Sequence, residues 1–413
     1  MTTATHHARK SVVITGIGAV SPLGNSFAAI ADSLLAGRSG VRSVEPGEFA
    51  RESHQFVATV DQIPAPPVDI CGLDESAFRG LTRFEQFCLS PAAHAIADAG
   101  LKDDRAVLRI GLVLGLGAEQ LKQWELDFLA GGTQVLMPRP DDTLVHRVAR
   151  RLDIRGPAVT VAAACASSGY AMALGRIWLQ AGWVDACVVG GCDIISPTAL
   201  AAFYNLRALS RRSDDPAKAS RPFDRDRDGF VMGEGGGCFV LETLASAHSR
   251  TTRIYGELAG VGMSSDAAHM VTPCADPTQA AQAITLALAD AGITAGEVDY
   301  VNAHAAGTPV GDAAESAAIR RALGAAVDRV PVSSTKSMSG HLISGAAAFE
   351  AVACLAAIDR QAVPPTVNLD HPDPHCQLDH VPHVARSRCV RVTASNSFGF
   401  GGANLCLVIR HAA

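Results

Sequence analysis

One cysteine, Cys165, stands between an expected strand and an expected helix and is surrounded by small residues. The strand covers Ala158–Val161, and the runs Ala162–Ala164 and Ala166–Gly169 on either side of the cysteine leave room for a substrate to reach the sulfur. A thiol at a helix N-terminus faces unpaired backbone N–H groups and the positive end of the helix dipole, and both favour the thiolate. We therefore expect Cys165 to be a nucleophile, and we interpret the other ten of the eleven cysteines as buried thiols of the core.

Two histidines lie in loops near expected strands. His304 belongs to the segment Asn302–Pro309, directly after the expected strand Val298–Val301, and His341 ends the segment Ser334–His341. A single loop histidine is more often a surface or structural residue than a catalyst. Two histidines at corresponding loops of a repeated unit favour catalysis, because paired imidazoles stabilise negative charge on a thioester oxygen or an enolate and exchange protons near neutral pH.

A glycine-rich segment, Asn396–Asn404, follows the expected strand Arg391–Ala394. Its backbone N–H groups could form an oxyanion hole, and its aromatic rings could gate a pocket. An ordinary glycine-rich turn explains the same residues, and both interpretations stay open at this point.

The elements that must position these residues alternate between strands and helices. Apolar strands are expected at residues 11–15, 109–114 and 186–189, in addition to the strand before Cys165, and a helix is expected at 27–35. Nearly continuous apolar strands separated by segments of helical periodicity are typical of an α/β protein whose sheets are covered on both faces.

The sequence also contains an internal repeat. The helix ends Ala95–Leu101 and Ala287–Ile293 share the pattern Ala-Asp-Ala-Gly followed by an aliphatic residue. In each copy a strand follows, and then a second strand leads to a turn of small residues and a helix, where the first copy presents Cys165 and the second presents His341. We therefore expect two halves, residues 1–253 and 254–413, folded into one compact unit around a common cleft.

The composition limits the classes of function. The chain has 413 residues, a net charge of −6 and 48% hydrophobic residues, which suits a globular protein and argues against a general nucleic-acid binder. The cysteines have no paired spacing, which favours free thiols in a reducing cytoplasm. The best candidate for a membrane span, Ala346–Ile358, is too short and contains Glu350, so we expect a soluble cytoplasmic protein with no membrane partner.

Two further motifs indicate no bound group. Gly115–Gln120 looks like a dinucleotide-binding loop but lacks the third glycine, and the histidines and cysteine of residues 371–383 fit no standard zinc-finger spacing. We expect no bound cofactor and no metal site.

Five motifs in order give the chain a family resemblance. The sequence resembles the elongating type II β-ketoacyl-(acyl-carrier-protein) synthases of the thiolase-like superfamily, from about Ser11 to Ile409. The resemblance implies a thiolase-like α/β fold in which two pseudo-symmetric halves build a five-layered α-β-α-β-α architecture. The motifs are Ala163–Ser167, Ser220–Asp224 with Arg227–Gly235, Val301–His304 with Thr308–Asp312, Ser334–His341 and Asn396–Gly402.

The resemblance implies a ping-pong condensation. Cys165 would take an acyl chain from the phosphopantetheine arm of an acyl carrier protein, and malonyl-carrier protein would then lose carbon dioxide and attack the acyl-cysteine. His304 and His341 would hold the malonyl thioester carbonyl. Lys336 would support the histidine loop, and an ion pair with Glu315 or another carboxylate is compatible with that role.

Further site residues follow from the same resemblance. The backbone N–H groups of Cys165 and Phe400 would form the oxyanion hole, and Phe400 would gate the acyl tunnel together with Phe398 and Gly399. Positions expected to contact the pantetheine or the acyl chain are Thr308, Gly401, Gly402 and Ala118. Asn302, Glu315 and Glu350 match positions that hold a structural cation in some relatives, but carboxylates beside Lys336 explain them equally well.

Acyl carrier protein is the expected partner. Because carrier proteins are acidic, docking needs basic residues, and Arg207, Arg79 and Arg83 match the entrance of the resembled enzymes. We expect a homodimer, with a heterodimer with a related subunit as the alternative. The alternative function is that of a non-catalytic, chain-length-setting partner subunit, which would lack the cysteine nucleophile that this chain has.

Departures from the family pattern concern the substrate. Ala305–Gly307 lack hydroxyls that contact pantetheine in relatives, Ala118 stands where a larger aliphatic residue narrows the acyl tunnel, and Met137–Asp142 is unusually polar. The sequence therefore leaves open whether the product belongs to fatty acid synthesis or to a type II polyketide or polyene.

Overall fold

Two sets of five strands share one topology in the computed structural model, which describes residues 10–44, 56–132, 142–212 and 214–412. In each set the first three strands in spatial order are parallel, and the last two are antiparallel to their neighbours. The first set, in spatial order, is β5 (Ala158–Val161), β4 (Ile110–Gly115), β6 (Ala186–Asp193), β7 (Gly235–Thr243) and β1 (Val12–Val20). The second set is β10 (Pro331–Ser333), β9 (Tyr300–Asn302), β14 (Val392–Gly399), β15 (Ala403–Arg410) and β8 (Gly256–Ser265).

The two sets join through a short contact. β1 pairs with β8 through only two residue pairs, Val13 with Glu257 and Ile14 with Gly256, and β12 (Asp379–His380) extends the far edge next to β10. The whole therefore counts as one sheet of 11 strands among the described residues. The matching strand order agrees with the repeat seen in the sequence.

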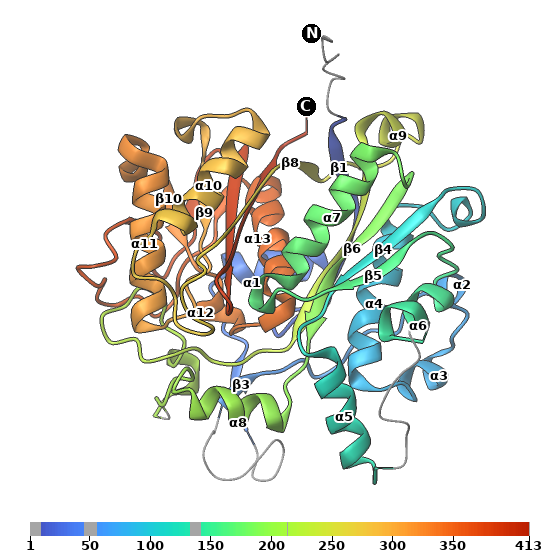
Figure 1. Cartoon of the computed structure of the whole chain (residues 1–413), viewed down its shortest axis with the longest axis horizontal. Helices are drawn as coiled ribbons and strands as arrows, with labels where there is room; N and C mark the ends of the chain where they lie inside the picture. Colours follow the sequence, from blue (N-terminus) through green and yellow to red (C-terminus); the bar gives the residue numbers. More distant parts are fainter. Residues whose placement is uncertain (1–9, 45–55, 133–141, 213, 413) are drawn as a thin grey trace.

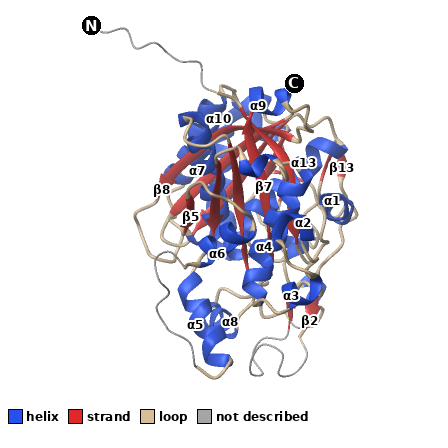
Figure 2. Ribbon diagram, turned by 90° about the vertical axis from the view of Figure 1, so that its right-hand side faces the viewer, coloured by secondary structure: helices blue, strands red, loops and turns tan. Residues whose placement is uncertain are grey.

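Helices form three layers around the two sets of strands (Figure 1). On one outside, α4 (Arg83–Asp98) packs on β1, β6 and β7; on the other, α10 (Thr278–Ala291) packs on β8 and β15 and contacts α11 (Pro309–Leu323). Between the sets, α7 (Ser167–Ala181) contacts β4 and β6, and α13 (Ala346–Arg360) contacts β14 and α7. Figure 2 shows the strands enclosed by these helices. The expected α/β fold with alternating helix and strand layers is confirmed.

The central helix α13 is buried on all sides, and Glu350 is the one charged residue of its segment Ala346–Ile358. Residues Ala346–Ile358 are all buried, which is how a helix without a polar face behaves when both sides meet sheets or helices. This is the segment that the sequence offered as the best candidate for a membrane span. No helix in the described parts of the chain is both long enough and apolar enough to cross a bilayer.

The remaining elements surround this frame. The helices are α1 (Phe27–Leu35), α2 (Val68–Cys71), α3 (Glu75–Arg79), α5 (Glu119–Leu129), α6 (Leu144–Arg151), α8 (Pro197–Asn205), α9 (Leu244–Ser249) and α12 (Lys336–Ser339). The short strands are β2 (Val41–Ser43), β3 (Phe56–Ala58), β11 (Ala362–Val363) and β13 (Arg386–Ser387). Residues 137–141 of the polar segment Met137–Asp142 lie outside the described residues.

The glycine-rich segment differs from expectation in one respect. The strand expected at Arg391–Ala394 continues as β14 to Gly399, where it pairs with Ala403 of β15. The segment is therefore mainly a hairpin whose turn is Phe400–Gly402, because main-chain pairing with β15 extends the strand beyond its apolar residues. Positive φ at Gly401 and Gly402, 83° and 80°, suits a tight turn.

Candidate active site

Cys165 lies at the junction of β5 and α7, as the sequence predicted. It belongs to a single 3₁₀ turn, Ala164–Ala166, that leads directly into α7. The side chain of Ser167 accepts a hydrogen bond from the Ala163 N–H at 2.9 Å and donates to the Ala164 carbonyl at 2.6 Å, which fixes the turn. Ala164 has a φ of 48°, a left-handed conformation that costs a non-glycine residue free energy and recurs at functional sites.

His341 contacts the Cys165 sulfur directly. Its Nε2 is 3.1 Å from the Cys165 sulfur, and its Nδ1 accepts a hydrogen bond from the Ile343 N–H at 3.3 Å. Because Nδ1 accepts, the hydrogen of the neutral ring is on Nε2 and points to the sulfur. Burial, followed by the charge of Lys336, lowers the pKa of His341 well below its usual value, so the ring stays neutral at physiological pH.

His304 lies beside His341 in an edge-to-face arrangement. The two ring centroids are 5.3 Å apart with an interplanar angle of 84°. The ammonium group of Lys336 is 3.4 Å from Nδ1 of His304, which leaves Nε2 of this ring as its N–H. Burial, the Lys336 charge and His341 lower the pKa of His304 well below its usual value. The site therefore holds two neutral imidazoles, each with a hydrogen on Nε2.

Lys336 is itself buried and forms an ion pair with Glu350, which also accepts a hydrogen bond from the Ser397 hydroxyl at 3.4 Å. Burial raises the pKa of Glu350, while Lys336 opposes the rise. Of the carboxylates considered from the sequence, Glu350 and not Glu315 is thus the partner of Lys336. Packing across α12 and α13 makes this choice, which sequence spacing does not show.

Glu315 has a different function in the structure. One of its carboxylate oxygens accepts from the His304 N–H at 2.9 Å and from the Asn396 side chain at 3.0 Å, and the other accepts from the Ala305 N–H at 2.6 Å. Burial outweighs these bonds and raises its pKa to about 7. Glu315 therefore fixes the main chain of His304 rather than its ring.

Burial works against the thiolate that the sequence predicts at Cys165. The side chain is 6% exposed, and apolar neighbours, among them Phe230 and Ile343, surround it. This desolvation raises the pKa of the thiol to about 12, although the charge of Lys336 and the Phe400 N–H lower it. The N-terminus of α7 acts in the same direction as Lys336. Burial at this position therefore favours the neutral thiol over the thiolate.

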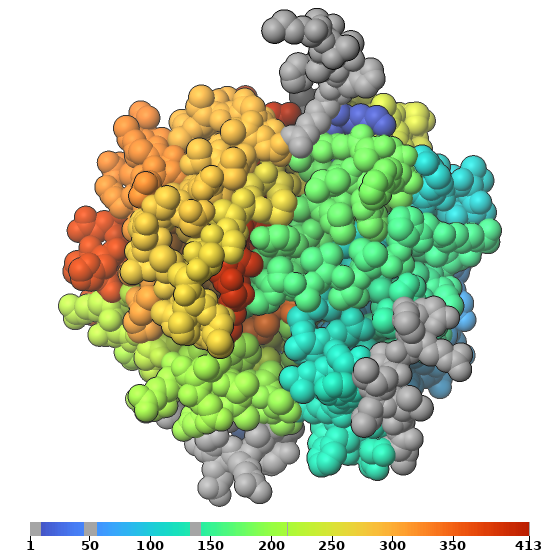
Figure 3. Space-filling model, viewed as in Figure 1, coloured from blue at the N-terminus to red at the C-terminus, as the bar shows by residue number. Residues whose placement is uncertain are grey.

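A cavity of about 300 Å³ opens in front of the sulfur. Its walls are mainly apolar, and one of them is the segment 271–277, which Figure 3 shows in yellow beside the red C-terminal residues. The cavity is lined by these predicted site residues: Cys165, His304, His341, Phe398, Gly399, Phe400, Gly402, Thr308 and Arg207. Glu315, Ala305 and Ala306, which the sequence analysis also named, line it as well.

Other predicted residues lie elsewhere. Gly401 is in the hairpin turn beside the cavity, and Ala118 precedes α5 with a φ of 51°. Arg83 binds the buried carboxylate of Glu234 and the Val60 carbonyl, and Arg79 binds Glu75 and the Ile63 carbonyl. These contacts occupy both arginines, so their docking role stays a prediction.

Three buried oxygens near the histidine loop have no hydrogen-bond donor. They are Oδ1 of Asn302, Oδ1 of Asn396 and Oγ of Ser395, and Asn302 and Ser395 are paired in register between β9 and β14. Oxygen atoms of this kind suit a water molecule or a hard cation. Within the described residues no group of His, Cys, Asp and Glu side chains is arranged to hold a metal ion, and the sequence expectation of no metal stays a prediction.

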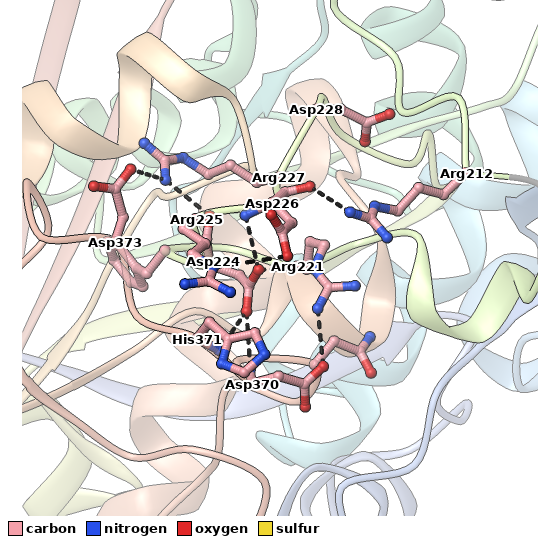
Figure 4. A network of polar contacts seen from close by, with 12 residues as sticks. Arg212, Arg221, Asp224, Arg225, Asp226, Arg227, Asp228, Asp370, His371 and Asp373 are labelled. Atoms are coloured by element: carbon pink, nitrogen blue, oxygen red, sulfur yellow. Dashed lines mark hydrogen bonds and ion pairs between the residues drawn. The ribbon is translucent and has the colours of Figure 1, made fainter.

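Arginines and aspartates of residues 212–228 form a network of polar contacts with residues 370–373 (Figure 4), and Arg227 of this network also binds the loop after His304. Arg227 donates to the carbonyls of Thr308 at 3.1 Å and Pro309 at 2.7 Å and forms an ion pair with Asp373 at 2.6 Å. Asp312 accepts from the N–H groups of Gly307 and Thr308. The motif around Arg227 was visible in the sequence, but its partners lie about 80 and 150 residues away and were not predictable from spacing.

Comparison with known proteins decides the family. The model of the β-ketoacyl synthase N-terminal domain matches residues 9–247, and the model of the C-terminal domain of the same family matches residues 255–370. The chain belongs to the β-ketoacyl synthase family. The predicted family resemblance is confirmed.

Relatives within the family include enzymes of primary and of secondary metabolism. The chain is 39% identical to the 3-oxoacyl-[acyl-carrier-protein] synthase 2 of Synechocystis sp., with 97% of this chain and 98% of the relative covered. It is 37% identical to the tetracenomycin polyketide synthase ketoacyl synthase alpha subunit of Streptomyces glaucescens, with 96% of each covered.

Solved structures agree on the fold. A β-ketoacyl synthase from Burkholderia phymatum is 34% identical and superimposes with a TM-score of 0.86, covering 98% of this chain and 100% of the other. The ishigamide ketosynthase/chain length factor is 33% identical with a TM-score of 0.85 and the same coverage. The thiolase-like fold predicted from the resemblance is thereby confirmed.

Proposed function

We propose that this protein is a 3-oxoacyl-(acyl-carrier-protein) synthase, an acyltransferase that condenses an acyl group on Cys165 with malonyl-acyl carrier protein and releases carbon dioxide. The observation that carries the proposal is the contact of the Cys165 sulfur with Nε2 of His341, with the ring of His304 against it, at the wall of one cavity. Family membership supports the reaction class.

In the first half-reaction the sulfur attacks the thioester carbonyl of an acyl chain carried on phosphopantetheine. The carbonyl oxygen takes negative charge and accepts hydrogen bonds from the N–H groups of Cys165 and Phe400, with Phe398 and Gly399 shaping the gate beside them. The tetrahedral intermediate collapses, the bond to the pantetheine sulfur breaks, and that sulfur leaves with the proton of the Cys165 thiol.

In the second half-reaction malonyl-carrier protein loses carbon dioxide. The electron pair of the broken carbon–carbon bond moves into an enolate, whose oxygen accepts hydrogen bonds from Nε2 of His304 and His341. Neutral imidazoles suit this role, because both pKa values lie well below the usual range and each ring presents an N–H. The enolate carbon attacks the acyl carbonyl, Cys165 leaves as a thiolate, and the thiolate takes a proton from water.

Lys336 keeps this arrangement neutral and oriented. Its ammonium group donates to Nδ1 of His304 and is balanced by Glu350, so a single buried charge pair sets the ring hydrogen on Nε2. No bound cofactor enters this scheme, since the substrates arrive on the phosphopantetheine of the carrier.

We assign part of the cavity wall to the pantetheine arm. Thr308 and Gly402 line the cavity and Gly401 lies in the adjoining turn, and we assign these residues to the pantetheine. Arg207 lines the cavity and is exposed, so it is our first candidate for docking the acidic carrier protein, with Arg79 and Arg83 as further predictions. We propose that the enzyme acts in the cytoplasm as a homodimer or as a heterodimer with a related subunit.

Two similar structures motivate the heterodimer: the ishigamide ketosynthase/chain length factor and the ketosynthase ApeO with its chain length factor ApeC from Xenorhabdus doucetiae. A third, AntDE:AntF, is a type II polyketide synthase acyl-carrier protein in complex with its ketosynthase. Because this chain keeps Cys165 together with both histidines, we assign it to the catalytic subunit and not to a chain-length-setting partner.

Intact-mass analysis tests the proposal. The protein is incubated with acyl-carrier proteins that bear chains of different length and unsaturation, and an acyl adduct is expected on wild type and absent from C165A. Addition of malonyl-carrier protein is expected to release the adduct as β-ketoacyl product. An adduct that survives in C165A refutes the mechanism, and the donors that react fastest distinguish fatty acid synthesis from a specialised pathway.

A further inference from the structure

A closed ring of hydrogen bonds lies next to the active site and has no part in the mechanism above. Lys122 of α5 donates to the Gly117 carbonyl at 2.7 Å and forms an ion pair with Asp193, the last residue of β6. The second oxygen of Asp193 accepts the Ser344 hydroxyl at 2.7 Å and the Ser344 N–H at 3.1 Å. The Ser344 hydroxyl oxygen in turn accepts from the Gly117 N–H at 2.7 Å, which closes the ring.

The three side chains of this hydrogen-bonded ring are buried, whereas Gly117 is partly exposed. Lys122 is 5% exposed, whereas Asp193 and Ser344 are 0% exposed. The Lys122 ammonium also lies 5.3 Å from the centre of the Phe84 ring. Removing two charges from water costs free energy that the pair does not fully regain by mutual attraction, so a buried pair is a poor means of gaining stability alone. A role in positioning neighbouring residues explains the buried ion pair better than a contribution to stability.

The ring connects two parts of the catalytic apparatus. Ser344 stands three residues after His341, in the 3₁₀ turn Ile343–Gly345 whose first N–H donates to His341. Ile343 has a φ of 46°, an unfavourable conformation for a β-branched residue, so surrounding contacts must hold the turn. Gly117 lies against the nucleophile turn, since a side-chain carbon there would be 4.0 Å from the Ala164 carbonyl oxygen and 2.4 Å from the Ser344 hydroxyl.

We propose that Lys122 and Asp193 are positioning residues for the condensation, which hold the turn after His341 so that its imidazole stays at the Cys165 sulfur. This inference rests on the proposed function. The carboxylate of Asp193 fixes Ser344 from one side, and Lys122 holds that carboxylate and the Gly117 turn together. The same ion pair ties α5 to both catalytic turns.

Kinetics of D193N, K122M and the double variant test the proposal. A small misplacement of a catalytic group costs up to roughly a hundredfold in rate, so we expect kcat of D193N and K122M to fall by about tenfold to a hundredfold per active site, with KM for the carrier substrates unchanged. The double variant K122M/D193N is expected to exceed K122M in kcat, because K122M alone leaves a buried carboxylate unpaired. Active sites are counted by alkylation of Cys165, which removes unfolded protein from the comparison.

The reactivity of Cys165 gives a second readout that simple loss of stability would not produce. Burial has the largest effect on the pKa of the Cys165 thiol, and the next effects come from Lys336, Asp193, Glu350 and the Phe400 N–H. The neutral ring of His341 lies 3.1 Å from the sulfur. Asp193 raises the pKa of the thiol. In D193N the rate of iodoacetamide alkylation is therefore expected to rise at lower pH than in wild type, while condensation becomes slower.

A matched control is D290N, which breaks the pair of Arg176 and Asp290 at 2.8 Å between α7 and α10. Both side chains are largely buried, so this variant should lose stability without a change in kcat per active site. If D193N does not fold, S344A removes the hydroxyl link without leaving a charge unpaired and should lower kcat in the same way. Unchanged kcat in D193N, or in S344A where it replaces D193N, refutes the positioning role, whereas a wild type inactive with every carrier substrate refutes the proposed function itself.

Discussion

The contact between the two halves at α7 can be tested by a substitution whose effect on the free energy of unfolding should change sign between two backgrounds. Gly169 is the third residue of α7, and a Cβ there would lie 2.2 Å from a terminal methyl carbon of Leu405 on β15 and 3.1 Å from Cβ of Ala347. Leu405 is fully buried, so its side chain has little freedom to move aside. Gly169 is therefore the point where the helix that carries Cys165 meets the second half.

The size of the effect follows from the overlap. A methyl group forced into a well-packed core costs about 1–3 kcal/mol, and the better helix propensity of alanine returns at most about 1 kcal/mol. The difference between these figures is about 0–2 kcal/mol. Because the added Cβ would lie 2.2 Å from a buried side chain, we expect G169A to lower the free energy of unfolding by an amount toward the upper end of that range. L405A alone should cost about 2–5 kcal/mol, because it leaves a cavity at the same place. In the L405A background the added methyl fills part of that cavity, so G169A should raise the free energy of unfolding.

Urea denaturation of wild type, both single variants and the double variant measures this reversal. G175A provides the control, because a Cβ at this position in the same helix would be 2.2 Å from Val189 of the first half. It should therefore destabilise wild type and L405A alike. If G169A changes the stability of both backgrounds in the same direction, the packing of α7 against β15 is not as described here.

Three further predictions concern buried charges. Because burial raises the pKa of Glu315 from 4.5 to about 7, the folded state binds a proton more tightly than the unfolded state. The stability that this proton contributes, roughly 3 kcal/mol, is fully present below about pH 4.5 and is lost as the pH rises through about 7. Thermal unfolding of E315Q should lack this pH dependence. K336M should slow alkylation of Cys165 at fixed pH, since the charge of Lys336 lowers the pKa of the thiol; an unchanged rate contradicts the assignment. R227M should cost about 3–5 kcal/mol in chemical denaturation by leaving Asp312 buried and unpaired, and D312N should relieve part of that loss.

The buried polar groups around the cavity hold the turns that carry the predicted site residues. Cys165 lies more than 100 residues before the two histidines and Lys336 along the chain. The turns next to Cys165 and His341 contain the left-handed residues Ala164 and Ile343, which backbone preferences alone would not keep. Carboxylates such as Glu315 and Asp193 hold these turns through main-chain N–H groups. The free energy lost by burying charge at these points is offset by the packing of five layers around them.

The sequence by itself determined the local features of this protein. A run of small residues between an apolar strand and a helix predicted the turn of Cys165, and the strand before His304 predicted its loop, because both depend on neighbours along the chain. The motifs were enough to indicate the family and the α/β fold.

Tertiary structure alone decided how distant side chains meet. It selected Glu350 over Glu315 as the partner of Lys336, extended β14 to Gly399 by pairing with β15, and opposed the thiolate by surrounding the sulfur with apolar residues. It also paired Lys122 with Asp193 across 71 positions of the chain. These contacts depend on which faces of the helices and sheets pack together. The spacing of apolar residues along the chain, every two or four positions, carries no information about that packing.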